Sequence, residues 1–173
     1  MIIMKDYVSV GNEKEKIALA EKLGFTELVF IGNADISKLK SKIKLSCSKR
    51  IIKSDVSKDR NVIESRKADI IYEFESANRK DGVHFLNSGL NQVLAKLMND
   101  KMVSYGISFS QLIGKSKTEQ ARILGRIMQN LKLVKKYKVS VIVGSFASKP
   151  SEMRDSRDLV AFAKTLGLND YRV

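Results

Sequence analysis

The sequence predicts one α/β domain with a parallel β-sheet, because short apolar strands and amphipathic helices alternate along it. Residues 5–10 alternate as a strand does, residues 12–23 repeat apolar side chains at helical spacing, and residues 27–32 form a short apolar run. A strand, a helix and a second strand in this order form a parallel pair joined by a helical crossover. The chain has 173 residues, 43% of them hydrophobic, which predicts a single domain over residues 1–173.

The next part of the chain continues this alternation with shorter elements. Residues 34–42 predict a short, lysine-rich helix. Residues 43–47 and 50–53 fit either two strands or one strand with a break, and the pattern does not choose between them. Residues 59–67 then predict a helix, and residues 68–74 predict a strand.

A polar loop over residues 75–85 follows that strand. In a repeating strand–helix fold it lies at the carboxyl end of the strand, where sites are usually built. A helix over 87–98 comes next, capped by Asn87 or Ser88, and the polar start of this segment is more than helix packing requires. Its predicted buried stripe consists of Leu90, Val93, Leu94, Leu97 and Met98.

The C-terminal third adds two more helices around a buried strand. Ser116 and Glu119 have capping-box spacing and open a long helix to about Tyr137. Residues 139–145 predict a buried strand, and Gly167 ends the last helix. The predicted strands number six or seven, whereas an eight-fold barrel typically needs about 250 residues. A reduced (βα) barrel and an open doubly wound sheet both fit this count.

The strongest feature of the composition is its positive charge. Thirty-two Lys and Arg residues stand against 19 Asp and Glu, a net charge of +13, which favours a polyanionic partner over a merely solubilising surface. No basic amphipathic helix with aromatic anchors is present, so we expect no membrane partner. Aromatic residues make up 7% and Trp is absent, which favours recognition of folded, double-helical RNA over stacking on single strands.

Residues for metal or nucleophilic chemistry are few. His84 is the only histidine, which weighs against a multi-histidine metal site. Cys47 is the only cysteine, so no disulfide is expected and a cytoplasmic location is the simplest one. Four acids lie on or just after predicted strands and suit either magnesium or salt bridges: Asp6, Asp69, Glu73 and Glu75. The residue types favour a binding module, with no catalytic residue, metal or cofactor in this chain.

Several segments together carry a resemblance to a known family. The segments are NSGLNQVLAKLMNDKMVSYGISFSQLI, RNVIESRKADIIYEFE, RKDGVHFLNSGLNQVLAKL, EQARILGRIMQNLKLVKKYKVSVIVGS and SEMRDSRDLVAFAKTLGL. They resemble ribonuclease P protein component 3, a barrel-shaped protein subunit shared by archaeal and eukaryotic ribonuclease P. The sequence departs from the family pattern between Gly32 and Ser57, where about one strand–helix unit is missing.

The resemblance implies a reduced TIM-barrel-like fold and a specific role. In this family the RNA component is catalytic and uses Mg²⁺ to cut the 5′ leader from precursor tRNA. The protein pairs with ribonuclease P protein component 2, binds ribonuclease P RNA, and meets precursor tRNA indirectly. The alternative is a metal-dependent phosphoester hydrolase of the related barrel superfamily, because a fold does not fix a function.

Basic side chains near helix starts and strand ends are the candidates for phosphate contact, because helix N-termini and cations can bind phosphate together. The predicted RNA-binding residues are Arg60, Arg79, Lys80, Lys96, Arg122, Arg126, Arg154 and Arg157.

Overall fold

The computed structural model describes residues 4–76, 81–82 and 86–173, and this part of the chain alternates strands and helices as predicted. The strands are β1 (Lys5–Ser9), β2 (Glu27–Ile31), β3 (Lys44–Ser48), β4 (Ile51–Lys53), β5 (Ile70–Tyr72), β6 (Ser104–Ser108) and β7 (Val141–Gly144). The α-helices are α1 (Glu13–Lys22), α2 (Asp59–Glu64), α3 (Gln92–Lys101), α4 (Lys117–Lys136) and α5 (Ser156–Thr165). Single 3-10 turns lie at Phe74–Ser76, Ser110–Leu112 and Pro150–Glu152.

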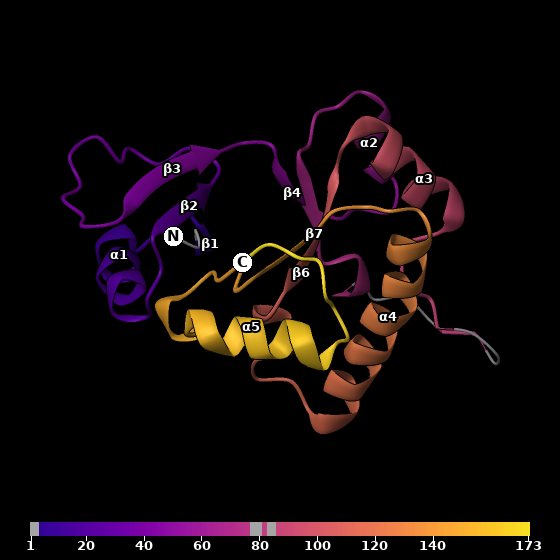
Figure 1. The fold of residues 1–173 in the computed structure, drawn as a ribbon. Coiled ribbons are helices and arrows are strands. Elements are labelled where there is room, and N and C mark those ends of the chain that lie inside the picture. The colour runs from indigo at the N-terminus through magenta and orange to yellow at the C-terminus, as the bar shows by residue number, and fades with distance from the viewer. Residues whose placement is uncertain (1–3, 77–80, 83–85) are drawn as a thin grey trace.

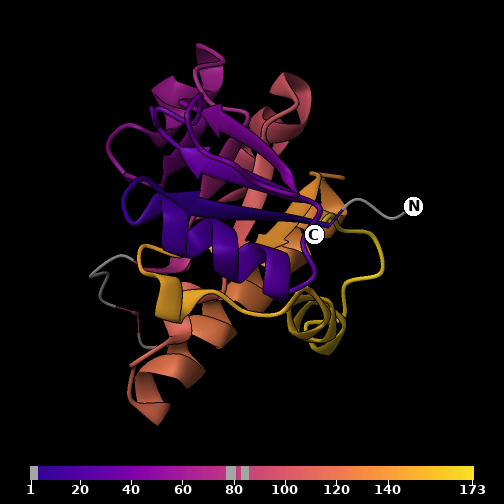
Figure 2. The same cartoon turned by 90° about the vertical axis from the view of Figure 1, so that its left-hand side faces the viewer.

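All strand pairs are parallel and form two sheets, β1-β2-β3 and β4-β5-β6-β7. Figure 1 shows the two sheets side by side, with α1 at one end of the molecule and α2, α3 and α4 at the other. Figure 2, turned by 90°, shows β1, β2 and β3 with α1 facing the viewer. This arrangement confirms the prediction of six or seven parallel strands in a reduced TIM-barrel-like fold.

The two sheets meet at both of their edges. The backbone N–H of Ser9 donates to the carbonyl of Ala147 at 2.9 Å, which joins β1 to the end of β7. At the opposite edge only Lys49 and Arg50 separate β3 from β4, and the two run in one direction. Of the two interpretations left open by the sequence, two strands is the correct one. β3 pairs with β2 in one sheet and β4 pairs with β5 in the other.

Aromatic rings fill the inside of the barrel. The ring of Phe146 stacks on Tyr7 at 5.2 Å between centroids and on Tyr72 at 4.5 Å. Two glycines make room for this stack, because a β-carbon on Gly106 would lie 2.8 Å from that of Tyr72, and one on Gly144 would lie 3.0 Å from the Tyr7 ring. The inner cluster consists of Tyr7, Val29, Ile51, Ile70, Tyr72, Ile142 and Phe146.

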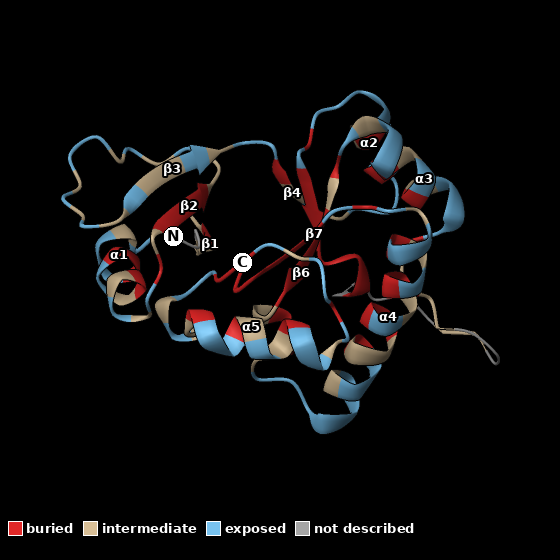
Figure 3. Ribbon diagram, viewed as in Figure 1, coloured by how far each residue is buried: buried red, intermediate tan, exposed pale blue. Residues whose placement is uncertain are grey.

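The larger apolar core lies between the strands and the helices. Figure 3 shows buried strands at the centre and exposed outer faces on the helices. On α4, apolar spacing in the sequence predicts a buried stripe of Ala121, Leu124, Ile127, Met128, Leu131 and Val134. Ile127, Leu131 and Val134 are indeed buried, but Met128 is 57% exposed. The buried face is shifted toward Arg126 and Asn130, two polar side chains that apolar periodicity leaves out.

Two helix predictions are wrong in detail. Residues 34–42 form turns and irregular backbone instead of the predicted helix. The helix expected over 87–98 begins only at Gln92, where the Asn91 side chain accepts a hydrogen bond from the Leu94 N–H at 2.8 Å. Val93 therefore lies in the first turn of the helix, where its side chain is 61% exposed and not part of the buried stripe.

Candidate nucleic-acid interface

A buried polar cluster lies behind the loop that follows β5. The Glu75 carboxyl is fully buried, accepts a hydrogen bond from the Tyr105 hydroxyl, and accepts another from Asn130 Nδ2 at 2.6 Å. Burial raises the pKa of Glu75, and these hydrogen bonds lower it by less. The cluster therefore holds a carboxyl group that keeps its proton more readily than a surface glutamate does.

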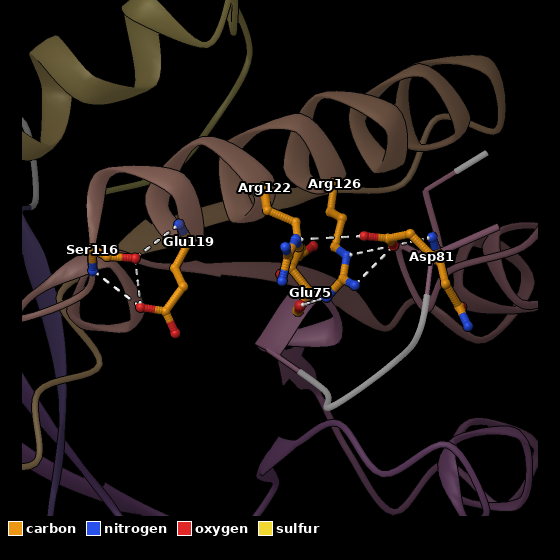
Figure 4. Close-up of polar contacts among 7 residues, drawn as sticks. Glu75, Asp81, Ser116, Glu119, Arg122 and Arg126 are labelled. Atoms are coloured by element: carbon orange, nitrogen blue, oxygen red, sulfur yellow. Dashed lines mark hydrogen bonds and ion pairs between the residues drawn. The ribbon is translucent and has the colours of Figure 1, made fainter. Parts of the chain in front are cut away.

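Arg126 clamps the loop onto α4. Its guanidinium donates to the Glu75 carbonyl at 2.9 Å and to Asp81 Oδ1 at 2.8 and 3.1 Å, while its side chain is only 4% exposed. The Asn87 N–H also donates to Asp81 Oδ1, at 2.7 Å. These contacts lower the pKa of Asp81, the Asn87 N–H contributing most and Arg126 next. Figure 4 shows Arg122 and Arg126 reaching from α4 toward Asp81, with Glu75 behind them.

The N-cap fixes where α4 begins, and therefore where Arg122 and Arg126 lie further along the helix. Ser116 Oγ accepts from the Glu119 N–H at 3.3 Å, and Glu119 Oε2 accepts from the Ser116 N–H at 3.1 Å. These contacts with Ser116 lower the pKa of Glu119. The capping box predicted from the sequence is confirmed.

Three predicted RNA-binding residues lie exposed on neighbouring helices at this end of the molecule. Arg60 on α2 pairs with Glu64 at 2.8 Å, and Lys96 lies on the outer face of α3. Arg122 is 53% exposed and lies 3.7 Å from Asp81. Arg126, by contrast, is turned inward and binds groups of its own chain.

Two further predicted residues lie together near the start of α5. Arg157 has a side chain 93% exposed, 3.9 Å from Asp155. Arg154 is half-buried, donates to the Met153 carbonyl at 2.8 Å, and lies over the Phe109 ring at 5.6 Å. The remaining two, Arg79 and Lys80, lie outside the described residues, as does His84.

Sequence reasoning missed the role of Asn130 in this site. Its Nδ2 donates to Glu75 Oε1 and, at 2.9 Å, to the Ser88 carbonyl, so it joins the loop to β6 and α4. The sequence spacing could have indicated this role, because Arg126 and Asn130 are four residues apart and therefore share one face of α4. Two polar residues on an otherwise apolar face indicate buried partners.

The acids considered for magnesium all have partners within the chain. Asp69 pairs with Arg50 at 2.6 Å, and Glu73 pairs with Lys53 at 2.7 Å. Asp6 is buried and accepts from the Ser145 N–H at 2.7 Å. Over the described ranges, no group of three or more His, Cys, Asp and Glu side chains is placed to hold a metal ion. No helix in those ranges is long and apolar enough to cross a membrane.

Comparisons with known proteins agree with the sequence resemblance. The family model "RNase P subunit p30" matches residues 60–173. Ribonuclease P protein component 3 of Methanocaldococcus jannaschii is 32% identical over 158 residues, which are 89% of this chain and 65% of that protein. The same component of Methanosarcina acetivorans is 34% identical over 84 residues, 49% of this chain and 35% of that protein. The chain thus spans less than two thirds of the length of these relatives.

Solved structures show the same fold. A chain in the cryo-EM structure of an archaeal ribonuclease P with mature tRNA superposes with a TM-score of 0.63 and 24% identity, covering 94% of this chain and 82% of that one. The crystal structure of an uncharacterized protein gives a TM-score of 0.55 at 12% identity, covering 96% and 70%. With a family model that matches from α2 to the end of the sequence, the chain belongs to the RNase P subunit p30 family.

Proposed function

We propose that this chain is a non-catalytic, RNA-binding protein subunit of ribonuclease P that supports the catalytic RNA in removing the 5′ leader from precursor tRNA. The observation that carries the proposal is family membership over residues 60–173. This range includes α2, α3, α4 and α5, and therefore every described residue of the candidate interface.

The proposal includes three partners and a location. The chain binds ribonuclease P RNA directly, pairs with ribonuclease P protein component 2, and contacts precursor tRNA only indirectly, in the cytoplasm. The Mg²⁺ that the reaction needs is held by the RNA, and this chain holds no metal or cofactor. The net charge of +13 supports RNA binding, because neutralising phosphates releases counterions.

We assign the proposed RNA-contact residues two roles according to their exposure. Arg60, Lys96, Arg122 and Arg157 keep cationic groups at the surface, where phosphate can reach them. Arg154 is half-buried, so phosphate can reach only part of its side chain. Arg79 and Lys80 stay in the proposal on sequence grounds. Arg126 is instead a positioning residue, because its buried guanidinium holds the loop in place.

Reconstitution tests this function. Ribonuclease P RNA is combined with component 2 and either wild-type chain or a variant with Arg60, Lys96, Arg122 and Arg157 changed to Gln, and precursor tRNA cleavage is measured. The wild-type chain should raise cleavage, and the variant should bind RNA with a salt dependence about four units shallower, since each lost phosphate contact removes about one unit. Lys22→Gln on α1, at the other end of the molecule, is the control.

Two results would contradict the proposal. One is cleavage by the RNA and component 2 that does not change when this chain is added. The other is metal-dependent phosphoester hydrolysis by the isolated chain, which would favour the hydrolase alternative.

A further inference from the structure

A groove of about 560 Å³ lies among α2, α3 and α4. Its size is within the range of small-molecule sites in proteins. Its floor is the segment 86–91, the polar stretch that helix packing does not require. The residues that matter for its chemistry are Val56, Arg60, Ser88, Val93 and Gln129.

Apolar side chains stand open to solvent at this groove. Val56 is 65% exposed and Val93 is 61% exposed, and both belong to the few large apolar residues of the described chain that face solvent. Two such side chains lining one groove give a flat or apolar group a surface to lie against. They make no hydrogen bonds, so they accept any base or side chain of suitable size.

Polar groups without partners lie beside the apolar ones. Ser88 is 2% exposed, yet its hydroxyl has no hydrogen-bond partner in the described ranges, which is costly for a buried polar atom. The Gln129 side-chain amide likewise makes no hydrogen bond there, and Arg60 adds a cation whose pair with Glu64 is exposed. The groove thus offers an amide donor and acceptor and a cation within one small volume, and it borders a buried hydroxyl that lacks a partner.

We propose that this groove binds one unpaired nucleotide of the RNA, with the base against Val56 and Val93, its polar edge toward Gln129 and Ser88, and its phosphate toward Arg60. Side chains that carry a donor and an acceptor together read base edges, and unpaired bases are what proteins read in RNA. The cation and the net charge of +13 favour a nucleotide over an apolar side chain of a protein partner. This inference rests on the proposed function and names the RNA feature recognised.

The proposal accounts for the scarcity of aromatic residues as well. Most of the RNA contact would be to paired segments through phosphates, and a single base would need only aliphatic contact plus hydrogen bonds. The site is therefore a local addition to shape recognition, because it does not need the series of stacking platforms that single-strand binders use.

The test uses the full chain and two RNA hairpins that share one stem, one fully paired and one with a single bulged adenosine. Affinities are measured by fluorescence anisotropy at two salt concentrations. The wild-type chain should bind the bulged hairpin about tenfold more tightly, as expected for one base contact. Val93→Ser and Gln129→Ala should each remove most of this preference and leave binding of the paired hairpin unchanged.

Met102→Ser is the matched control, because Met102 is 78% exposed at the end of the same helix and does not line the groove. It should keep the full preference. Equal wild-type affinity for the two hairpins, or equal weakening of both by Val93→Ser, would overturn the inference while leaving the proposed function in place. A Val93→Ser change that weakens only component 2 binding would also overturn it. Loss of all RNA binding by the wild-type chain would reject the proposed function itself.

Discussion

Asp6→Asn should stabilise the chain at neutral pH and change its pH dependence. Asp6 is fully buried where β1 meets β7, and both of its oxygens accept hydrogen bonds from Ser145. Burial raises its pKa from an ordinary 3.8 to about 6, although the Ser145 hydrogen bonds lower it. An asparagine retains both contacts, because its oxygen accepts from the Ser145 N–H and its amide donates to the Ser145 hydroxyl.

The sign and size follow from the two pKa values. The folded chain binds this proton more tightly than the unfolded chain does, so the stabilising contribution is complete below pH 3.8 and is lost as the pH rises through about 6. The full loss is about 3 kcal/mol, of which about 2 kcal/mol falls between pH 4.5 and 7.5. Between pH 4.5 and 7.5, the free energy of unfolding of Asp6→Asn should therefore rise by about 2 kcal/mol relative to that of wild type. For a chain of this length, this corresponds to about 6 °C in melting temperature.

Urea unfolding of both proteins at several values of pH between 4.5 and 7.5 measures this difference directly. Taking the difference between variant and wild type removes the other titrating groups, which both proteins share. Asp69→Asn is the control for loss of a carboxylate, since the Asp69 side chain is 58% exposed. A stability difference that is flat across the range, or an Asp6→Asn variant less stable than wild type at pH 7.5, would refute the reasoning.

Three further changes probe the clamp, the barrel interior and the helix cap. Arg126→Met removes a guanidinium that is 4% exposed and should cost about 3 kcal/mol and speed hydrogen exchange in the loop, whereas Arg122→Met should do neither. Gly106→Ala places a β-carbon 2.8 Å from a neighbouring one and should cost about 2 kcal/mol in urea unfolding; a neutral result would mean that the aromatic stack can shift. Ser116→Ala removes the α4 cap and should cost about 1 kcal/mol by thermal unfolding, with Lys117→Ala as the neutral comparison.

The parts of the fold that sequence predicted correctly are those set by local signals. Apolar runs ended by glycine located the strands, and Ser116 with Glu119 located the start of α4 because both halves of a capping box lie within one turn. Whether residues 43–53 form one strand or two stayed open in the sequence, because β3 and β4 pair with different neighbours. That pairing depends on how the two sheets meet, which no local pattern records.

The errors arose where another contact, either local or distant in sequence, replaced the one that the pattern predicts. Asn12 and Glu15 have capping-box spacing, but Asn12 adopts a left-handed conformation and makes no cap bond, and Glu13 accepts from the Gly11 N–H instead. Apolar counting on α4 found Ile127, Leu131 and Val134 but missed Arg126 and Asn130, the polar residues of the same buried face. Their partners are Glu75, Asp81 and Ser88, which are 42 to 55 residues away in the sequence.

In the proposed function, burial decides more than pairing which arginines can contact the RNA. Arg60 and Arg157 each lie near an acid, but their side chains are 70% and 93% exposed. Exposed ion pairs contribute little to stability, so a phosphate can replace the acid at small cost. Arg126 cannot be released in the same way, because its own guanidinium is buried and its departure would leave the Glu75 carbonyl without this donor. Arginine therefore has two different environments in this chain. The buried Arg126 fixes the loop, whereas in the proposed function the exposed arginines exchange an acid for a phosphate.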